Sequence, residues 1–192
     1  MTHVVGNDRH AHAVAAWHAD HAAFSRLLDL LDAEVIAFHT GAEPNYPLMF
    51  EILHYLHQYV DCSHHPREDV AFARLAQREP TLTLQVARRL QEHRVIAAAG
   101  ERLVTLLNGI MNGEDLIARA EVERAAATYL VYYRYHLRAE EELVIPQAVA
   151  RLTPEDWSDV AAAGTTVADP LAARVIDPRY SELRRALGTP VC

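Results

Sequence analysis

The sequence predicts an all-α protein: an up-down-up-down four-helix bundle followed by a short C-terminal helical extension. Three observations predict this fold class. Apolar residues recur three and four positions apart through four long segments, which is the spacing of amphipathic helices. The 7 glycines and 9 prolines of the 192 residues cluster, which leaves long uninterrupted stretches, and strand patterns are absent. Four such helices joined by short turns bury their apolar stripes on one another in a bundle.

The first two helices are separated by a proline-containing turn. The first is expected over residues 13–38, and Thr40-Gly41 ends it. The second begins at residue 48 and runs to about residue 78. Pro66 lies inside it, and a proline in a helix removes one backbone hydrogen bond and costs about 3 kcal/mol. We therefore expect the second helix to be kinked or broken near Pro66.

The third helix is expected over residues 81–111 and the fourth over residues 115–151, with a turn at 112–114 between them. No proline occurs between Thr81 and Ile145, so long helices are permitted there. With the first two helices they form a bundle domain over residues 1–152.

Residues 153–192 are expected to form the C-terminal extension. Thr153 is suited to cap a short helix that runs through Ala163, with Asp156 as its partner three residues later. The remainder, residues 164–192, is expected to be an arm with one weak helical turn.

Charge and composition exclude several classes of partner. All 18 basic residues are arginines in a chain of net charge −8, so no polybasic face is offered to nucleic acid or anionic lipid. No apolar run approaches the ~18 residues that cross a bilayer. Only two cysteines are present, and the first ten residues lack the apolar core of a signal peptide. We expect a cytoplasmic protein without a nucleic-acid or membrane partner.

The chain contains 12 histidines, and two of them begin matching H-x-x-x-E pentads. One pentad joins His64 to Glu68 in the second helix, and the other joins His136 to Glu140 in the fourth. Residues four apart lie on one helix face, close enough for an imidazole and a carboxylate to reach one metal ion. Bundle cores hold pairs of metal ions with inward-pointing carboxylates and histidines. The paired pentads therefore predict a metal centre in the bundle core.

The other two helices also supply histidines, His18 and His21 on the first and His93 on the third. Four imidazoles and two carboxylates, with no thiolate, suit iron or manganese and are acceptable to zinc. Six donors exceed the four of a closed zinc site, so two ions with positions left for water, dioxygen or peroxide are expected. Iron is the preferred metal.

Several histidines are alternatives at these positions. His18 lies within one turn of His21 and could replace it, although His21 is favoured. His65 lies three residues before Glu68, so it shares the same face and could replace His64, which is favoured. His57 lies one heptad before His64 and could be an additional ligand, but a hydrogen-bonded core histidine is the commoner outcome.

These segments resemble the hemerythrin-like, or HHE cation-binding, family. The resemblance runs through residues 16–21, 61–69, 92–93 and 136–141, and residues 152–157 are similar to the tail of bacterial members. It implies a four-helix bundle that holds a non-haem diiron centre, two iron ions joined by an oxo or hydroxo bridge. Carried over by position, the resemblance implies these ligands: His21, His64, Glu68, His93, His136 and Glu140. Glu68 and Glu140 would be the bridging carboxylates.

The chain departs from the oxygen-carrying hemerythrins at two positions. Their third helix bears a second histidine one turn away, but Arg89, Leu90, Ile96 and Ala97 occupy those positions around His93. Their fourth-helix carboxylate is an Asp five residues after the histidine, whereas Glu140 follows His136 by four. Reversible oxygen carriage is therefore not the expected function.

We expect a protein that reacts with or senses dioxygen, peroxide or another small diatomic ligand, or that handles iron. Peroxidase- or catalase-like activity is left open, as is a homodimer. One alternative is a metal-binding protein without turnover that stores or buffers iron or holds zinc. Another is a structural interaction bundle whose arm, residues 164–192, docks on a partner.

Overall fold

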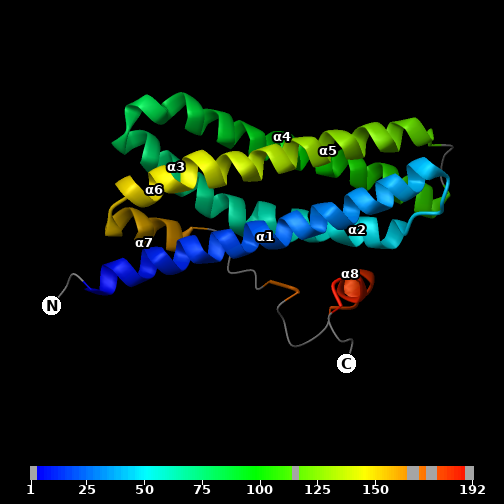
Figure 1. Ribbon diagram of the computed structural model, residues 1–192, viewed down its shortest axis with the longest axis horizontal. Helices are drawn as coiled ribbons and strands as arrows, with labels where there is room; N and C mark the ends of the chain where they lie inside the picture. Colours follow the sequence, from blue (N-terminus) through cyan, green and yellow to red (C-terminus); the bar gives the residue numbers. More distant parts are fainter. Residues whose placement is uncertain (1–3, 114–116, 164–168, 172–176, 189–192) are drawn as a thin grey trace.

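The computed structural model describes residues 4–113, 117–163, 169–171 and 177–188, and all the regular structure in these ranges is helical. The predicted all-α bundle is confirmed. Four long helical arms run alongside one another, and the first is the single helix α1 (Val4–Thr40) (Figure 1). It begins earlier than expected and ends where predicted, at Gly41, whose φ of 87° is the left-handed conformation that often terminates helices.

The second arm contains a π-helix where the sequence predicted a kink or break. It consists of α2 (Tyr46–Tyr55), the π-helical segment η1 (Leu56–His64) and α3 (His65–Arg78). At the end of η1 the backbone N–H of His65 bonds to the carbonyl of Val60, five residues back. This wider turn accommodates Pro66, which has no N–H, without breaking the arm.

The third arm is α4 (Thr83–Asn112), which follows the short 3₁₀ segment η2 (Pro80–Leu82) and agrees with the prediction. The fourth arm was predicted as one helix from residue 115, but α5 (Arg119–Ala139) gives way to the π-helical segment η3 (Glu140–Val144) and then α6 (Ile145–Arg151). Residues 114–116 lie outside the described ranges. Pro146 follows η3 as Pro66 follows η1, and each pentad has one residue, His64 or Glu140, inside a π-helix. Such π-helical turns occur frequently at functional sites.

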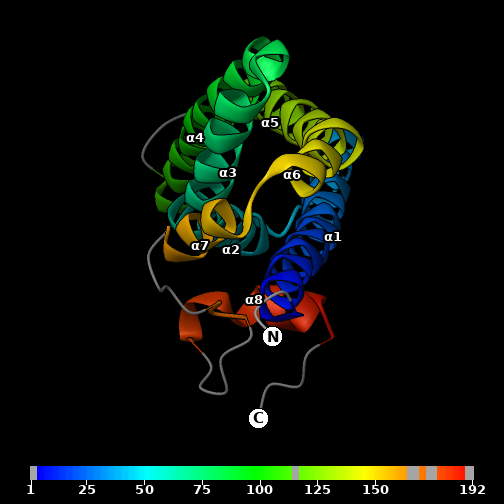
Figure 2. The ribbon, with the colours of Figure 1, turned by 90° about the vertical axis from the view of Figure 1, so that its left-hand side faces the viewer.

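The arms pack in a closed ring, seen end-on in Figure 2. α1 contacts α5, α5 contacts α4, α4 contacts α2 and α3, and α2 contacts α1. Two apolar clusters fill the bundle: one includes Phe24, Ile52 and Leu107, and the other includes Trp17 and Phe72. On every arm the candidate ligands lie between residues of one cluster and residues of the other. The site is therefore closed by apolar side chains at both ends.

The described parts of the extension lie against the bundle. Thr153 and Asp156 form the predicted capping box, and α7 (Pro154–Ala162) packs on α3 and α1, with Trp157 5.6 Å from Trp17 between ring centres. The segments η4 (Pro178–Tyr180) and α8 (Ser181–Ala186) pack on α2, so the described part of the arm has more structure than the expected single turn. The division at residue 152 stays a prediction. Among the described residues, no helix has the length and apolar character needed to cross a membrane.

Candidate metal centre

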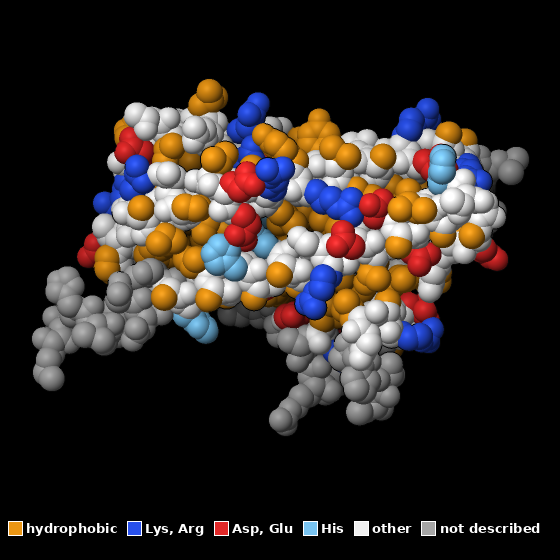
Figure 3. Space-filling view, in the orientation of Figure 1, with side chains coloured by type: hydrophobic (Ala, Val, Ile, Leu, Met, Phe, Trp, Pro, Cys, Tyr) orange, Lys and Arg blue, Asp and Glu red, His pale blue; other side chains and the backbone are white. Residues whose placement is uncertain are grey.

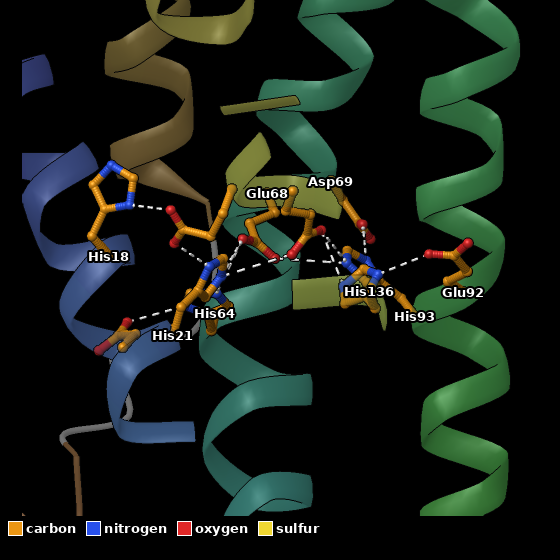
Figure 4. A network of polar contacts seen from close by, with 11 residues as sticks. His18, His21, His64, Glu68, Asp69, Glu92, His93 and His136 are labelled. Atoms are coloured by element: carbon orange, nitrogen blue, oxygen red, sulfur yellow. Dashed lines mark hydrogen bonds and ion pairs between the residues drawn. The ribbon is translucent and has the colours of Figure 1, made fainter. Parts of the chain in front are cut away.

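The six residues predicted as metal ligands come together in the middle of the bundle. Figure 4 shows five of them, His21, His64, Glu68, His93 and His136, side by side. The six lie on all four arms and are all buried: His21, His64, Glu68, His93, His136 and Glu140. His18 is not among them, because its side chain is 48% exposed and contacts Glu141. His57 is also on the outside, where it pairs with Asp61.

The possible ligand atoms form two groups that share one carboxylate. Those of His21, His64 and Glu68 lie within 4.8 Å of one another. Those of His65, Glu68, His93 and His136 do the same. The glutamate that the groups share, Glu68, is fully buried.

Both buried glutamates turn one oxygen toward each group. Glu68 Oε1 lies 3.2 Å from His21 Nε2 and 3.1 Å from His64 Nε2, while its Oε2 lies 3.6 Å from His93 Nε2. Glu140 Oε2 lies 3.7 Å from His21 Nε2, while its Oε1 lies 3.4 Å from His93 Nε2 and 3.0 Å from His136 Nε2. The two carboxylates therefore span the space between two sets of imidazoles.

His65 is brought into the site beside His64 rather than in place of it. Its ring stacks on that of His93 with 4.0 Å between ring centres, and its Nδ1 donates to Asp61 at 3.0 Å. Burial lowers the pKa of His65 to about 4, and the hydrogen bond to Asp61 only partly offsets it. The imidazole is neutral at pH 7, which is the form that binds metals. The sequence signal for His65 was its position three residues before Glu68.

Each of the other four imidazoles donates its Nδ1 proton to a carboxylate that the sequence analysis missed. The pairs are His64 with Asp20 at 3.0 Å, His93 with Asp69 at 2.7 Å, His136 with Glu92 at 3.1 Å, and His21 with Glu141 at 2.8 Å. Such partners orient the rings so that Nε2 faces the centre, and its electron pair can bind a metal once the Nε2 proton is lost.

These acidic partners follow one rule around the bundle. Each stands next to a candidate ligand in the sequence but bonds to the histidine of the following arm, and Glu141 on the fourth arm closes the ring at His21 on the first. The signal in the sequence is an acidic residue directly beside a candidate ligand, as in Asp20-His21 and Glu92-His93. Nothing in the sequence assigns each acid to its partner, because that depends on which arms are neighbours.

The electrostatics of the site favour cations. Glu68 Oε2, Glu140 Oε2 and His136 Nε2 are buried and make no hydrogen bond to any described residue. Burial and Glu68 both raise the pKa of Glu140, but His136 and His93 outweigh them and hold that pKa at about 2. Burial also raises the pKa of Glu68, but His64 and His21 outweigh it and hold that pKa well below its usual range, so both carboxylates are ionised at neutral pH. Buried polar atoms that make no hydrogen bond are costly. The donor set therefore fits a pair of metal cations.

Metal binding at this site should strengthen as the pH rises. In the metal-free protein, burial lowers the pKa values of His64 and His93, but nearby carboxylates outweigh it. With Glu68 as the main contributor, they raise the pKa of His64 to about 9. With Asp69 as the main contributor, they raise the pKa of His93 to about 10. These raised pKa values stabilise the folded, metal-free protein. Their contribution is complete below pH 6.5, the pKa of both histidines in the unfolded chain, and is lost as the pH rises through 9 to 10. Metal must displace the same protons.

The increase in melting temperature caused by metal should therefore be larger at about pH 8.5 than at about pH 6.5. Calorimetric melts of loaded and stripped protein across this range measure the difference. An increase that is constant, or that shrinks toward high pH, would contradict the protonation states described above.

A surface opening leads to one side of the site. A cavity of about 500 Å³ lies between α1 and α5 and is lined by His18, His21, Arg134 and Glu141, among others. Figure 3 shows histidine and acidic side chains together on the face where these helices run side by side. His21 is therefore a candidate ligand that lines this opening.

A comparison with protein families matched the chain to a family profile. The profile described as the hemerythrin HHE cation binding domain matches residues 12–148, a span that includes all the candidate ligands. No curated protein and no solved structure matched the chain.

Proposed function

This chain belongs to the hemerythrin HHE cation-binding family, and from that premise we propose that its buried site holds two iron ions that react with peroxide or dioxygen. The observation that carries the proposal is that Glu68 and Glu140 each turn one oxygen toward His21 and the other toward His93. A carboxylate in this arrangement can bridge two ions. Imidazole and carboxylate donors without thiolate suit iron.

Two unequal sets of imidazoles would hold the ions. His21 and His64 face one position, while His65, His93 and His136 face the other. The third helix lacks the second histidine that oxygen-carrying hemerythrins have. His65, on the second arm, provides a third imidazole for this second set instead. When bound, a pair of iron ions would supply redox chemistry with peroxide or dioxygen.

The residues around the site determine the side from which a small ligand would approach it. The position beside His21 and His64 has one imidazole fewer, and it also lies under the opening lined by His18 and Glu141. Glu141 accepts a hydrogen bond from His21 Nδ1 through one oxygen and contacts His18 through the other. It therefore orients the His21 imidazole at the mouth of the opening. Apolar clusters exclude water from both ends of the site. A small ligand would therefore approach from the α1 and α5 side.

Replacing His65 tests whether one metal position has three imidazoles and the other has two. We expect His65→Gln to lower the metal content from about two ions per chain to about one after dialysis against a mild chelator, because one position loses an imidazole. His57→Gln is the matched control, since His57 also pairs with Asp61 but lies outside both groups. Elemental analysis measures the content. If His65→Gln keeps both ions as firmly as the control does, His65 is not a ligand.

Reaction with peroxide tests the function. Conversion of two hydrogen peroxide molecules to two waters and one dioxygen needs no further reductant, so oxygen release by the loaded protein is a sufficient assay. We expect release from the iron-loaded chain and none from the metal-free chain. If neither peroxide nor dioxygen changes the loaded protein's absorption and no peroxide is consumed, the reactive function is wrong. The chain would then be a metal-binding protein without turnover.

A further inference from the structure

A second cavity lies between α4 and the fourth arm. Its volume is about 330 Å³, within the range of small-molecule sites. Apolar side chains line much of it, including Leu84, Tyr135 and Leu143, together with Arg88 and Arg89. None of the candidate metal ligands lines this cavity.

Arg89 is a buried cation with unused hydrogen-bonding capacity. Its side chain is only 5% exposed, and its Nη2 donates to Glu92 Oε1 at 2.6 Å. Its guanidinium carbon lies 5.3 Å from the centre of the Tyr135 ring. Its Nη1 is buried and has no hydrogen-bond partner among the described residues. A buried charged donor without a partner is destabilising. Because Arg89 lines the cavity, an anion that entered far enough to reach Nη1 would satisfy it.

We propose that this cavity binds a small organic anion, a carboxylate carried on an apolar chain. Arg89 Nη1 would donate to the carboxylate, since guanidinium groups bind carboxylates through charge-assisted hydrogen bonds. Leu84 and Leu143 would contact the apolar chain. These two side chains are 82% and 57% exposed, so they can turn outward as the ligand enters without opening the core.

A small anion fits this cavity better than a protein partner does. Exposed apolar residues alone, such as Leu84 and Leu143, would suit a flat protein interface. A cavity with a buried cation in its wall instead offers a specific anchor for one charged group. Binding here does not require metal, so the proposal stands apart from the proposed function. It is nevertheless near the metal centre, because Glu92 accepts from both Arg89 and His136.

Titration calorimetry with the full chain tests this proposal, with sodium octanoate as the probe and 1-octanol as its uncharged counterpart. We expect octanoate to bind one site per chain, with and without metal. Octanol should bind about tenfold more weakly or not at all, because it lacks the charge that Arg89 recognises. Absence of octanoate binding, or equal affinity for the two probes, would overturn the proposal.

Two substitutions place the site. Leu84→Glu adds a negative charge at the rim on an exposed residue, so it should leave the fold intact and weaken octanoate binding roughly fivefold or more. Ile36→Glu, on an exposed residue of α1, is the matched control and should change nothing. Arg89→Gln should abolish binding, with a thermal melt to verify folding.

Unchanged octanoate affinity in Leu84→Glu would place the binding elsewhere and overturn the assignment. If Leu84→Glu changes the oligomeric state and the original chain does not bind octanoate, this surface is a protein interface. That result would also overturn the proposal.

Discussion

Replacing Glu68 by glutamine is expected to remove both metal ions from the purified chain. Glu68 is the residue that the two groups of ligand atoms share, and both its oxygens face imidazoles. The amide has nearly the same shape but no charge, so each position loses an anionic donor. We expect the metal content to fall from about two ions per chain to nearly none, as measured by elemental analysis after reconstitution.

The matched control is Glu142→Gln on the same arm as the second pentad. Glu142 is exposed and pairs with Arg138 on the surface, so its replacement should leave the metal content unchanged. Circular dichroism of both variants verifies the helical fold. If Glu68→Gln keeps two ions per chain, Glu68 does not join two metal positions and the proposed centre is wrong.

Stripping the metal should lower the melting temperature by roughly 10 °C. A ligand present at about 1,000 times its dissociation constant stabilises the native state by about 4 kcal/mol. For a chain of 150 to 250 residues, each kcal/mol shifts the melting temperature by about 2 to 4 °C. The shift should be large because the metal would bind buried atoms that make no hydrogen bond to any described residue: Glu68 Oε2, Glu140 Oε2 and His136 Nε2.

Differential scanning calorimetry of loaded and chelator-treated protein measures this effect. Glu68→Gln provides the control, because it should melt at the same temperature before and after chelator treatment. Equal melting temperatures for the loaded and stripped original chain would mean that the histidines and glutamates are not a metal centre. A structural interaction bundle would then be the better interpretation.

The helices and their local signals were readable from the sequence. Apolar spacing placed the four arms because burial of one helix face imposes that period. The cap formed by Thr153 and Asp156 depends only on residues three apart, so it could also be predicted. The two pentads were informative for the same reason, since residues four apart always share a helix face.

What the sequence did not reveal depends on contacts between arms. The π-helical segments beside Pro66 and Pro146 have no reliable local pattern. A kink or break was therefore expected near Pro66, and a single continuous helix was expected through Pro146. The order of the acidic partners around the ring follows from which arms are neighbours. His65 was treated as a competitor of His64, but the site is wide enough to take both, one on each side. Arg89 was noted only because a histidine was missing there, yet it lines a cavity of its own.

The central claim is that two iron ions share the carboxylates of Glu68 and Glu140. The most direct test is the iron content per chain of reconstituted, desalted protein, measured together with its near-ultraviolet and visible absorption. We expect about two irons per chain, with the charge-transfer bands of a bridged pair. One iron per chain without such bands, or no retained iron, would contradict the claim.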